Sequence, residues 1–566
     1  MSLFSTLQLA GNALQAQSIG LQVVGQNIAN VNTPGYSRAE VNFTPAPTQR
    51  VGKLLLGLGV EVESVKQKAD AHLNERLRSA AADRAGGEVQ EKAYQQLETL
   101  IGELQDTDVS TSLNDFLGAV AQILNQPESV SVRNLAVLQG KTLAGDVARL
   151  AARAGDLRSD VNDQVIALEP DVNRLLKRIA ELNVKIATTE GGSAARSDAV
   201  GLRDERNAAL ESLSKLIDVR TQEQDSGAVN VFAGGDFLVF EGISRNVTVH
   251  YADEGGVKSA SLYVAETDSP LQIASGKLAG LVDARDNILG RFLGDLDDFA
   301  GSLAFEFNKI YASGQGLTGY ANLTSERGVV DRTQPLDAAG LPFTPVNGSF
   351  DVLVRDKQTG LTKTTRITID LNGLDGDDTT TDDLVSRLDA VDGLSAAYDS
   401  TGRIVLRSES SVGEFAFSND TSGTLAALGI NTFFTGSTAR DLAVNAAVAS
   451  DPAKFAASRS GIDGDTQNAV DLAAFLDRPL ESLDGKSIGQ SYDELVSNVT
   501  QGASVAKSVA EGFRTFEDTL RGEQLAISGV NLDEEAVNMI AFQRAFQASA
   551  RLVSTITDLL NLLTSL

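Results

Sequence analysis

Residues 1–38 read MSLFSTLQLAGNALQAQSIGLQVVGQNIANVNTPGYSR, and Arg38 is the first charged residue of the chain. Apolar residues recur in this stretch at intervals of seven, at Leu7, Leu14, Leu21 and Ile28. A second seven-residue series runs beside the first one, at Leu3, Ala10, Gln17, Val24 and Val31. Two interleaved series of this kind indicate a helix with an a/d seam, which needs a second helix to pack against.

The polar side chains of this N-terminal helix are Gln, Asn and Ser, without the charges that a surface helix normally carries. Neutral amides tolerate burial better than ions do, provided that each one finds a hydrogen-bond partner. Gly11, Gly20 and Gly25 each cost a helix about 1 kcal/mol relative to Ala. We therefore expect a segment that is loose by itself and is ordered by a partner.

The other end of the chain offers that partner. Two apolar series with a spacing of seven run along it: Leu532, Met539, Phe546, Val553 and Leu560, and Phe542, Ser549, Ile556 and Leu563. The charges after Ala536 share one outer stripe, at Arg544, Arg551 and Asp558. The pattern predicts that the two terminal helices pair. A coiled coil closing an ordinary domain is the alternative, although neither helix carries the charged flanks that usually set such pairing.

Composition excludes several classes of function. The chain has 566 residues, 48 of them basic and 76 acidic, for a net charge of −28. Nucleic-acid and anionic-membrane binding need clustered Lys and Arg, so neither is expected. There is no Cys, and the only histidines are His72 and His250, which excludes disulfides and Cys-based zinc sites. We expect no secretory signal, no membrane span and a soluble chain, with export by a route that reads no cleavable signal still open.

The chain in order predicts a nested, multidomain and mainly α architecture. An Asn-Thr-Pro-Gly-Tyr stretch at 32–36 predicts a type II turn, followed by an extended segment with a short hairpin at 40–63. Helical spacing dominates 66–217, 276–312 and 487–527. Alternating patterns predict a β-hairpin region at about 218–266 and a β-rich α+β insertion with a short helix at 382–388. Asn531, with Glu534 three residues later, predicts a capping box for the final helix.

These elements give three predicted domains. Residues 1–40 and 528–566 would form a discontinuous coiled-coil core, residues 41–316 and 439–527 a long helical bundle, and residues 317–438 an outer β-rich insertion.

No motif makes a positive case for catalysis or for a cofactor. Residues 314–319 match GxGxxG, but they follow a helix and precede none, so the dinucleotide interpretation fails. Acidic stretches near Asp375 and Asp463 lack the full ligand pattern of a calcium loop and are interpreted as acidic turns. We therefore expect no catalytic, cofactor or metal residues and a protein that is not an enzyme.

Two motifs carry a family resemblance. NIANVNTPGYSR at 27–38 resembles the N-terminal signature of bacterial flagellar axial proteins of the rod, hook and junction, and SGVNLDEEAVNMIAFQRAFQASARLV at 528–553 resembles their C-terminal signature. The length, the long helical region and the insertion are most similar to the subfamily at the hook–filament junction. Ala536 departs from the pattern, because a larger apolar residue is common there.

The resemblance implies a structural subunit of the flagellum that joins hook to filament, with a rod-type or hook-type axial protein as the alternative. Its partners would be further copies of itself in a ring, the hook protein, the second hook-associated junction protein, an export chaperone on the C-terminal helix and the flagellar export apparatus. The protein would be secreted, and its paired terminal helices would line the export channel.

The residues expected at the assembly interface lie in both terminal segments. In the N-terminal segment they are Leu7, Leu14, Leu21, Val24, Asn27, Ile28, Asn30, Asn32, Thr33, Pro34, Gly35 and Tyr36. In the C-terminal helix, where the chaperone would also bind, they are Asn531, Leu532, Met539, Phe542, Phe546, Val553, Ile556, Leu560 and Leu563. A surface adhesin and an enzyme with an acidic site in the insertion are two further alternatives.

Overall fold

The computed structural model describes residues 3–33, 35–51, 54–102, 108–191, 197–254, 257–374 and 376–565. The fold is mainly α and multidomain, as the sequence predicts. Its longest helices are α1 (Leu3–Ala29), α2 (Ala71–Gly102), α4 (Val130–Glu190), α12 (Ile488–Ser528) and α13 (Leu532–Thr564). The chain forms two compact units, which are described separately: Met1–Lys92, Ser159–Arg285 and Ser504–Leu566 make unit 1, and Ala93–Arg158 and Asp286–Ala503 make unit 2. The three-domain division stays a prediction.

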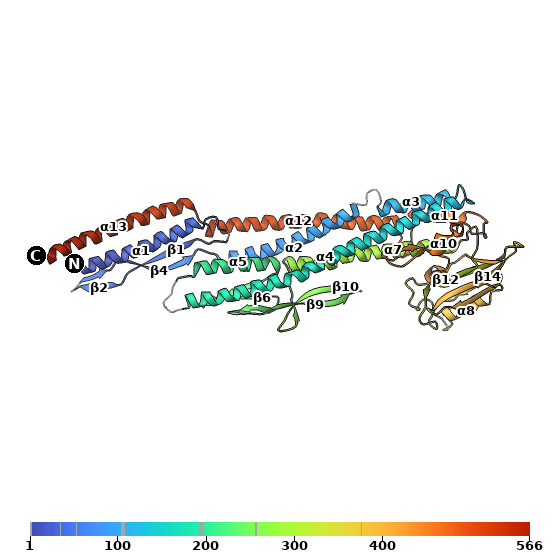
Figure 1. The fold of residues 1–566 in the computed structure, drawn as a ribbon, viewed down its shortest axis with the longest axis horizontal. Helices are drawn as coiled ribbons and strands as arrows, with labels where there is room; N and C mark the ends of the chain where they lie inside the picture. The colour runs from blue at the N-terminus through green and yellow to red at the C-terminus, as the bar shows by residue number, and fades with distance from the viewer. Residues whose placement is uncertain are drawn as a thin grey trace. The chain divides into compact units, whose positions relative to one another are not determined.

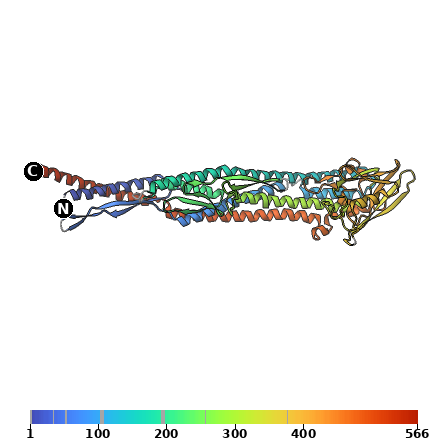
Figure 2. The same ribbon diagram turned by 90° about the horizontal axis from the view of Figure 1, so that it is seen from below.

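Both chain ends belong to unit 1. Helices α1 and α13 run side by side in both views of the ribbon, as the seams predict (Figures 1 and 2). A β-ribbon follows α1 and contacts it. In this ribbon β1 (Ala39–Pro45) pairs antiparallel with β4 (Val60–Gln67), and β2 (Thr48–Val51) pairs with β3 (Leu54–Gly57). The predicted hairpin is thus confirmed, as the inner part of a longer ribbon.

The rest of unit 1 combines helices with two small antiparallel sheets. Its helices are α5 (Val200–Leu216), α6 (Lys277–Asp283) and parts of α2, α4 and α12. One sheet orders β5 (Arg220–Glu223), β6 (Val229–Ala233), β7 (Asp236–Phe240) and β8 (Ile243–Ser244); the other orders β11 (Ser269–Pro270), β10 (Val257–Val264) and β9 (Val247–Glu254). These strands confirm the β region expected at 218–266.

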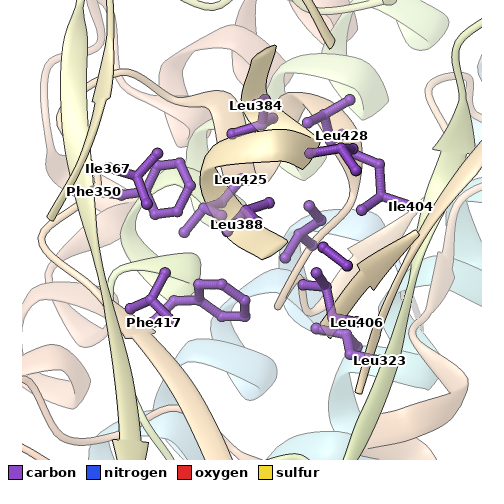
Figure 3. Packing of buried hydrophobic residues seen from close by; sticks show 14 of the residues in the cluster. Leu323, Phe350, Ile367, Leu384, Leu388, Ile404, Leu406, Phe417, Leu425 and Leu428 are labelled. Carbon is purple, nitrogen blue, oxygen red and sulfur yellow. The ribbon is translucent and has the colours of Figure 1, made fainter. Parts of the chain in front are cut away.

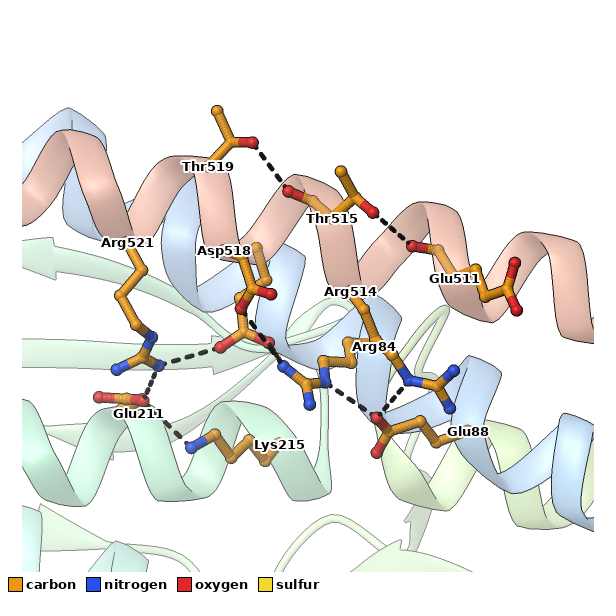
Figure 4. Close-up of polar contacts among 11 residues, drawn as sticks. Arg84, Glu88, Glu211, Lys215, Glu511, Arg514, Thr515, Asp518, Thr519 and Arg521 are labelled. Carbon is orange, nitrogen blue, oxygen red and sulfur yellow. Dashed lines mark hydrogen bonds and ion pairs between the residues drawn. The ribbon is translucent and has the colours of Figure 1, made fainter.

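Ion pairs join α12 to its neighbours in unit 1 (Figure 4). The Arg514 guanidinium lies 3.1 Å from Glu88 of α2, and the Arg84 guanidinium lies 3.3 Å from Glu517 of α12. Arg521 reaches Glu211 of α5 at 2.8 Å. Apolar contacts lie beside them: Leu73, Leu77, Ala80 and Leu520 form one cluster, and Phe513 of α12 packs against Gly87 of α2. Ion pairs and apolar packing thus both join α12 to α2.

Unit 2 has an aromatic core. It is built on α3 (Val109–Gln122), α7 (Gly290–Ala312), which continues the π-helical turn η1 (Ala284–Leu289), and α11 (Gln467–Ala473). The rings of Phe116 and Phe433 stack with centroids 5.2 Å apart, and Phe307 lies 5.2 Å from Phe116. Gly140 of α4 faces this cluster so closely that a Cβ there would lie 2.6 Å from Phe433. The aromatic core therefore requires glycine at position 140, because any side chain there would clash with Phe433.

The β-rich part of unit 2 has two three-stranded sheets around an apolar core (Figure 3). One orders β12 (Asn322–Gly328), β16 (Arg403–Ser408) and β15 (Leu394–Tyr398); the other orders β14 (Thr362–Ile369), β13 (Gly348–Asp356) and β17 (Gly413–Ser418). Helix α8 (Thr381–Asp389) begins with a capping box between Thr380 and Asp383 and buries Leu384 and Leu388. The smaller elements nearby are α9 (Thr424–Leu428), β18 (Phe434–Thr435), β19 (Ala443–Val444), α10 (Ala446–Ser450), η2 (Pro452–Lys454), η3 (Phe475–Asp477) and η4 (Glu481–Leu483).

The GxGxxG stretch has a packing role. A Cβ on Gly316 would lie 2.5 Å from the Ala453 carbonyl oxygen, and one on Gly319 would lie 2.9 Å from the Phe415 carbonyl oxygen. These glycines therefore let neighbouring backbone segments approach.

The sequence predicts acidic turns near Asp463 and Asp375. In the first, the Asp465 carboxylate accepts hydrogen bonds from the backbone N–H groups of Arg459, Ser460 and Gln467, which closes a turn. Asp375 itself lies outside the described residues. Within the described ranges, no group of three or more His, Asp or Glu could hold a metal ion, and no helix is long and apolar enough to cross a membrane.

Candidate assembly interface

Helix α1 is the centre of the terminal part of unit 1, because it contacts α13 and the β1–β4 ribbon. Its buried residues are small or β-branched, apart from one asparagine: Ala10, Ala16, Gly20, Val23, Val24 and Asn27. The ribbon is tied to α1 by the Asn12 amide, which donates to the Leu58 carbonyl at 3.0 Å. The adjacent Gly59 has a φ of +92° and packs against Leu9. Asn12 is one of the neutral amides that need a hydrogen-bond partner when buried, and it finds this partner in the Leu58 carbonyl of the ribbon.

Gly20 allows the two terminal helices, α1 and α13, to pack closely against each other. A Cβ at this position would lie 3.1 Å from the Phe542 ring of α13. Phe542 also contacts Phe43 of β1 edge to face, with ring centroids 6.0 Å apart. Phe542 therefore bridges α1 and the ribbon.

Asn27 is the hydrogen-bonding centre of the turn that follows α1. Its Oδ1 accepts from the Ala39 N–H at 3.0 Å and from the Tyr36 hydroxyl at 2.8 Å. Its Nδ2 donates to the Ala39 carbonyl at 2.9 Å and to the Glu535 carboxylate at 3.2 Å. Burial, with the nearby charges of Asp204 and Glu535, raises the pKa of Tyr36 to about 12, so this hydroxyl remains a donor at neutral pH. One buried side chain thus joins α1, the turn, β1 and α13.

Arg38 connects the same turn to the start of α13. Its guanidinium lies 2.7 Å from Glu534 and 2.7 Å from Glu535, whose side chain is only 1% exposed. Its backbone N–H donates to the Ser528 carbonyl at the end of α12. Asn531 caps α13 as predicted, by accepting from the N–H groups of Asp533 and Glu534. The Glu534 carboxylate binds Arg38 instead of completing the predicted capping box.

A third acidic group ties the turn to α5. The Asp204 carboxylate accepts from the Ser37 N–H at 3.3 Å and from the Gln67 amide at 2.7 Å. Burial raises the pKa of Asp204 to about 6, although both hydrogen bonds oppose the shift. The joint between the terminal segment and α5 therefore contains a group that titrates close to neutral pH.

The predicted N-terminal residues divide by burial. Val24 and Asn27 are buried, and Leu7, Leu14, Leu21, Ile28, Asn30 and Tyr36 are half-buried. Asn32, Thr33 and Gly35 are exposed. The Tyr36 N–H donates to the Thr33 carbonyl, and Gly35 has a φ of +78°, both of which suit the predicted type II turn; Pro34 lies outside the described residues.

The predicted C-terminal residues lie mostly on the face of α13 that meets α1. Ile556 is buried, and Met539, Phe542, Val553 and Leu560 are half-buried. Leu532, Phe546 and Leu563 are exposed, as is the helix-capping Asn531. The expected seam thus faces α1 over most of its length.

A second apolar row lies on a different face of α13. It consists of Val537, Ile540, Leu552, Leu559 and Leu562, with exposed fractions between 38% and 66%. Sequence analysis missed this row, because the seven-residue series drew attention to the opposite face. It also missed the Arg38–Glu535 pair and Asp204. Arg38 is the first charged residue of the chain, and this could have indicated that it pairs with an acid such as Glu535. No local sequence pattern indicates a role for Asp204.

Comparisons with known proteins agree with this geometry. A family model described as the flagellar hook-associated protein FlgK helical domain matches residues 94–324. Models for the flagellar basal body rod FlgEFG protein C-terminal region and for the flagella basal body rod protein match residues 522–566 and 7–36. These last two matches cover α13 and α1, the helices that form the candidate interface.

Similarity to individual proteins extends over nearly the full chain. Flagellar hook-associated protein 1 of Escherichia coli (strain K12) is 24% identical over 566 residues, which cover 97% of each chain. The protein of the same name from Bacillus subtilis (strain 168) is 24% identical over 99% of this chain and 97% of its own. The solved flagellar hook junction protein FlgK from Burkholderia pseudomallei shares the fold, with a TM-score of 0.50, 15% identity, and coverage of 80% of this chain and all of that one. The chain is thus similar to flagellar hook-associated protein 1 over nearly its full length, and this similarity supports a structural role in the bacterial flagellum.

Proposed function

We propose that this protein is the subunit that joins the flagellar hook to the filament, and that it polymerises through α1 and α13. The observation that carries the proposal is the second apolar row of α13, which remains exposed after α1 has covered the first. Complete burial of such a side chain from water contributes about 1.5–3 kcal/mol, and these five are 38–66% exposed, so each can still contribute part of that value when copies associate.

The outer face of α1 suits the same role. Its exposed side chains include Gln8, Gln15, Ser18 and Gln22, and the helix carries no charge anywhere along its length. Neutral amides can be buried between subunits at a lower cost than ions, because they need only hydrogen-bond partners. Each α1–α13 pair would therefore offer an apolar row and an uncharged row to its neighbours in a ring.

The residues predicted from sequence would then serve two purposes. Those on the α1–α13 seam build the pair inside one subunit, and the turn from Asn27 to Arg38 fixes where α13 begins. We propose that the hook protein and the second hook-associated protein contact the ring from either side. The three predicted domains would place the terminal core inside and the insertion of residues 317–438 outside.

Export and chaperone binding follow from the same surface. A row of exposed aliphatic residues on one helix promotes aggregation in a free chain. We propose that a chaperone covers α13 before the flagellar export apparatus secretes the protein.

The test is the position of labelled protein on the flagellum. The wild-type chain should appear at the hook–filament junction, whereas a signal along the rod or the hook would support the alternative axial types. Ile540→Asp with Leu552→Asp should abolish incorporation, because it puts two charges into the apolar row.

The matched control for this variant is Gln543→Asp. This residue is exposed on the same helix but lies outside the row, so the change should leave incorporation intact. Normal incorporation of the double variant would refute the proposed contact.

A further inference from the structure

A cavity of about 340 Å³ lies inside unit 1, away from the α1–α13 interface. Its wall is formed by the start of α2, by α5 and by strands β5 and β6, with Gln67 at the end of β4. The volume falls in the range of small-molecule sites. Three arginines line it: Arg78, Arg203 and Arg206.

Arg203 is fully engaged by carboxylates. Its Nε and Nη2 bind both oxygens of Glu190 at 2.7 Å, and its Nη1 binds Glu223 at 2.7 Å. Glu190 thus binds Arg203, whereas the Glu223 oxygen that binds Arg203 also lies 3.8 Å from Nη2 of Arg206.

Arg206 is buried and, among the described residues, makes no direct hydrogen bond to a carboxylate. Only 2% of the residue is exposed, and its Nη1 donates to the neutral oxygens of Asn183 and Gly227. Its nearest carboxylate is Glu223, at 3.8 Å from Nη2, and among the described residues its Nε has no hydrogen-bond partner.

Arg78 is similarly placed. Its Nη2 donates to the Thr221 hydroxyl at 2.8 Å, while its Nε is buried without a partner within the described ranges. Burial lowers the pKa of Arg78, and burial together with repulsion from Arg203 and Arg78 lowers the pKa of Arg206 to about 10. Both guanidinium groups thus line the same poorly solvated cavity, each with a buried Nε that has no partner among the described residues.

Two buried and incompletely paired guanidinium groups destabilise the folded state unless an anion neutralises their charge. Buried charges are normally paired, and a chain with 76 acidic residues has many carboxylates with which to pair them. The acid beside Arg78 on α2 is Glu75, which is exposed. From the cavity, its size and the two incompletely paired arginines we infer that this pocket binds a small oxyanion, a phosphate or carboxylate compound, between Arg78 and Arg206.

The remaining wall suits a polar ligand. The Asn207 side chain lines the cavity and has no hydrogen-bond partner among the described residues, and His72 is exposed beside it. Guanidinium groups bind phosphate and carboxylate through paired N–H donors, which explains why either chemistry fits. A ligand here would also contact Gln67, whose amide holds Asp204 at the joint with the terminal segment. This inference does not depend on the proposed role in the flagellum.

The experiment measures binding and thermal stability of the full-length protein with two probes, inorganic phosphate and succinate, against sodium chloride at the same ionic strength. At least one probe should bind in a saturable way and raise the Tm above that in chloride. Preference for phosphate would assign a phosphate compound, preference for succinate a carboxylate compound, and equal binding the shared chemistry. No saturable binding of either probe would overturn the inference.

Variants locate the site. Arg78→Gln should weaken binding about tenfold or more, because it removes a charged donor pair. Arg76→Gln is the matched control, since it removes the same charge from the same helix at an exposed position whose ion pair is with Glu523. Equal loss in both variants, or in neither, would overturn the inference.

Asn207→Asp guards against a trivial folding defect. It places a carboxylate inside the cavity, so the ligand-free Tm should rise and the response to the probe should disappear. An unchanged response to phosphate and succinate in this variant would contradict the assignment.

Discussion

Asn27 and Glu535 are 508 positions apart in the chain and share a hydrogen bond of 3.2 Å at a buried site. The same asparagine binds Ala39 through both backbone groups and accepts from Tyr36. The two ends of the protein are thus joined at one side chain, and the joint is closed by Arg38 across Glu534 and Glu535.

Replacing Asn27 by Ala should open this joint. The change removes the hydrogen bonds of Asn27 to the Ala39 backbone groups and one of the contacts of the buried Glu535 carboxylate, which keeps Arg38; the loss costs about 2–3 kcal/mol locally. Hydrogen exchange should then rise around residues 36–40 and 531–536. Asn30→Ala is the control, because the hydrogen bonds of the Asn30 side chain within the described residues are exposed ones, to the Gln26 carbonyl and from the Thr33 hydroxyl; equal effects of the two variants would contradict the role of Asn27.

Two glycines of α1 should respond in opposite directions. Gly20→Val introduces atoms where a Cβ alone would lie 3.1 Å from Phe542, so α1 and α13 must separate and the Tm of the terminal segment should fall. Gly11 has nothing within 4 Å of its Cβ position. Gly11→Ala should therefore stabilise α1 by up to about 1 kcal/mol through helix propensity. Destabilisation by Gly11→Ala, measured by thermal unfolding, would show that its open side is needed by the fold.

The terminal pairing could be predicted from sequence because it depends on spacing. The seven-residue intervals reveal the seam of each terminal helix, as between Leu7 and Leu14 or between Met539 and Phe546. The residue type and position of Asn531 likewise indicate the N-terminal cap of α13. The mainly α fold follows from the same periodicity.

The contacts that fix the joint could not be predicted in this way. Asp204 lies on α5, and only the folded chain brings it to the Ser37 N–H. Gly20 meets Phe542 across two helices, so its role depends on a distance that no local pattern contains. The second apolar row of α13 could not be predicted either. Its exposure is known only once the structure shows which face of α13 is covered by α1.

Acidification should strengthen the joint at Asp204. Its folded pKa of about 6 lies above the ordinary value of 3.8, so the folded state holds its proton to a higher pH than the unfolded state does. The contribution of this group to stability therefore falls as the pH rises from about 4 to about 6, and is constant above that range. Asp204→Asn should raise the Tm at neutral pH, since an amide oxygen still accepts from Ser37 and Gln67, and the gain should shrink towards about pH 4. A gain that is independent of pH would show that ionisation of Asp204 is not the cause.

Self-association should increase with salt. Each copy carries a net charge of −28, so copies repel one another at low ionic strength, whereas α1 carries no charge and α13 exposes its second apolar row beside only three charges, Arg544, Arg551 and Asp558. Salt screens the repulsion, with a Debye length of about 10 Å at 0.1 M, and leaves the apolar contact intact. Sedimentation of the purified protein should therefore show larger species at high salt than at low salt, and Ile540→Asp with Leu552→Asp should remove them at both. Dissociation on adding salt would mean that ion pairs between copies, and not the apolar row of α13, hold the assembly together.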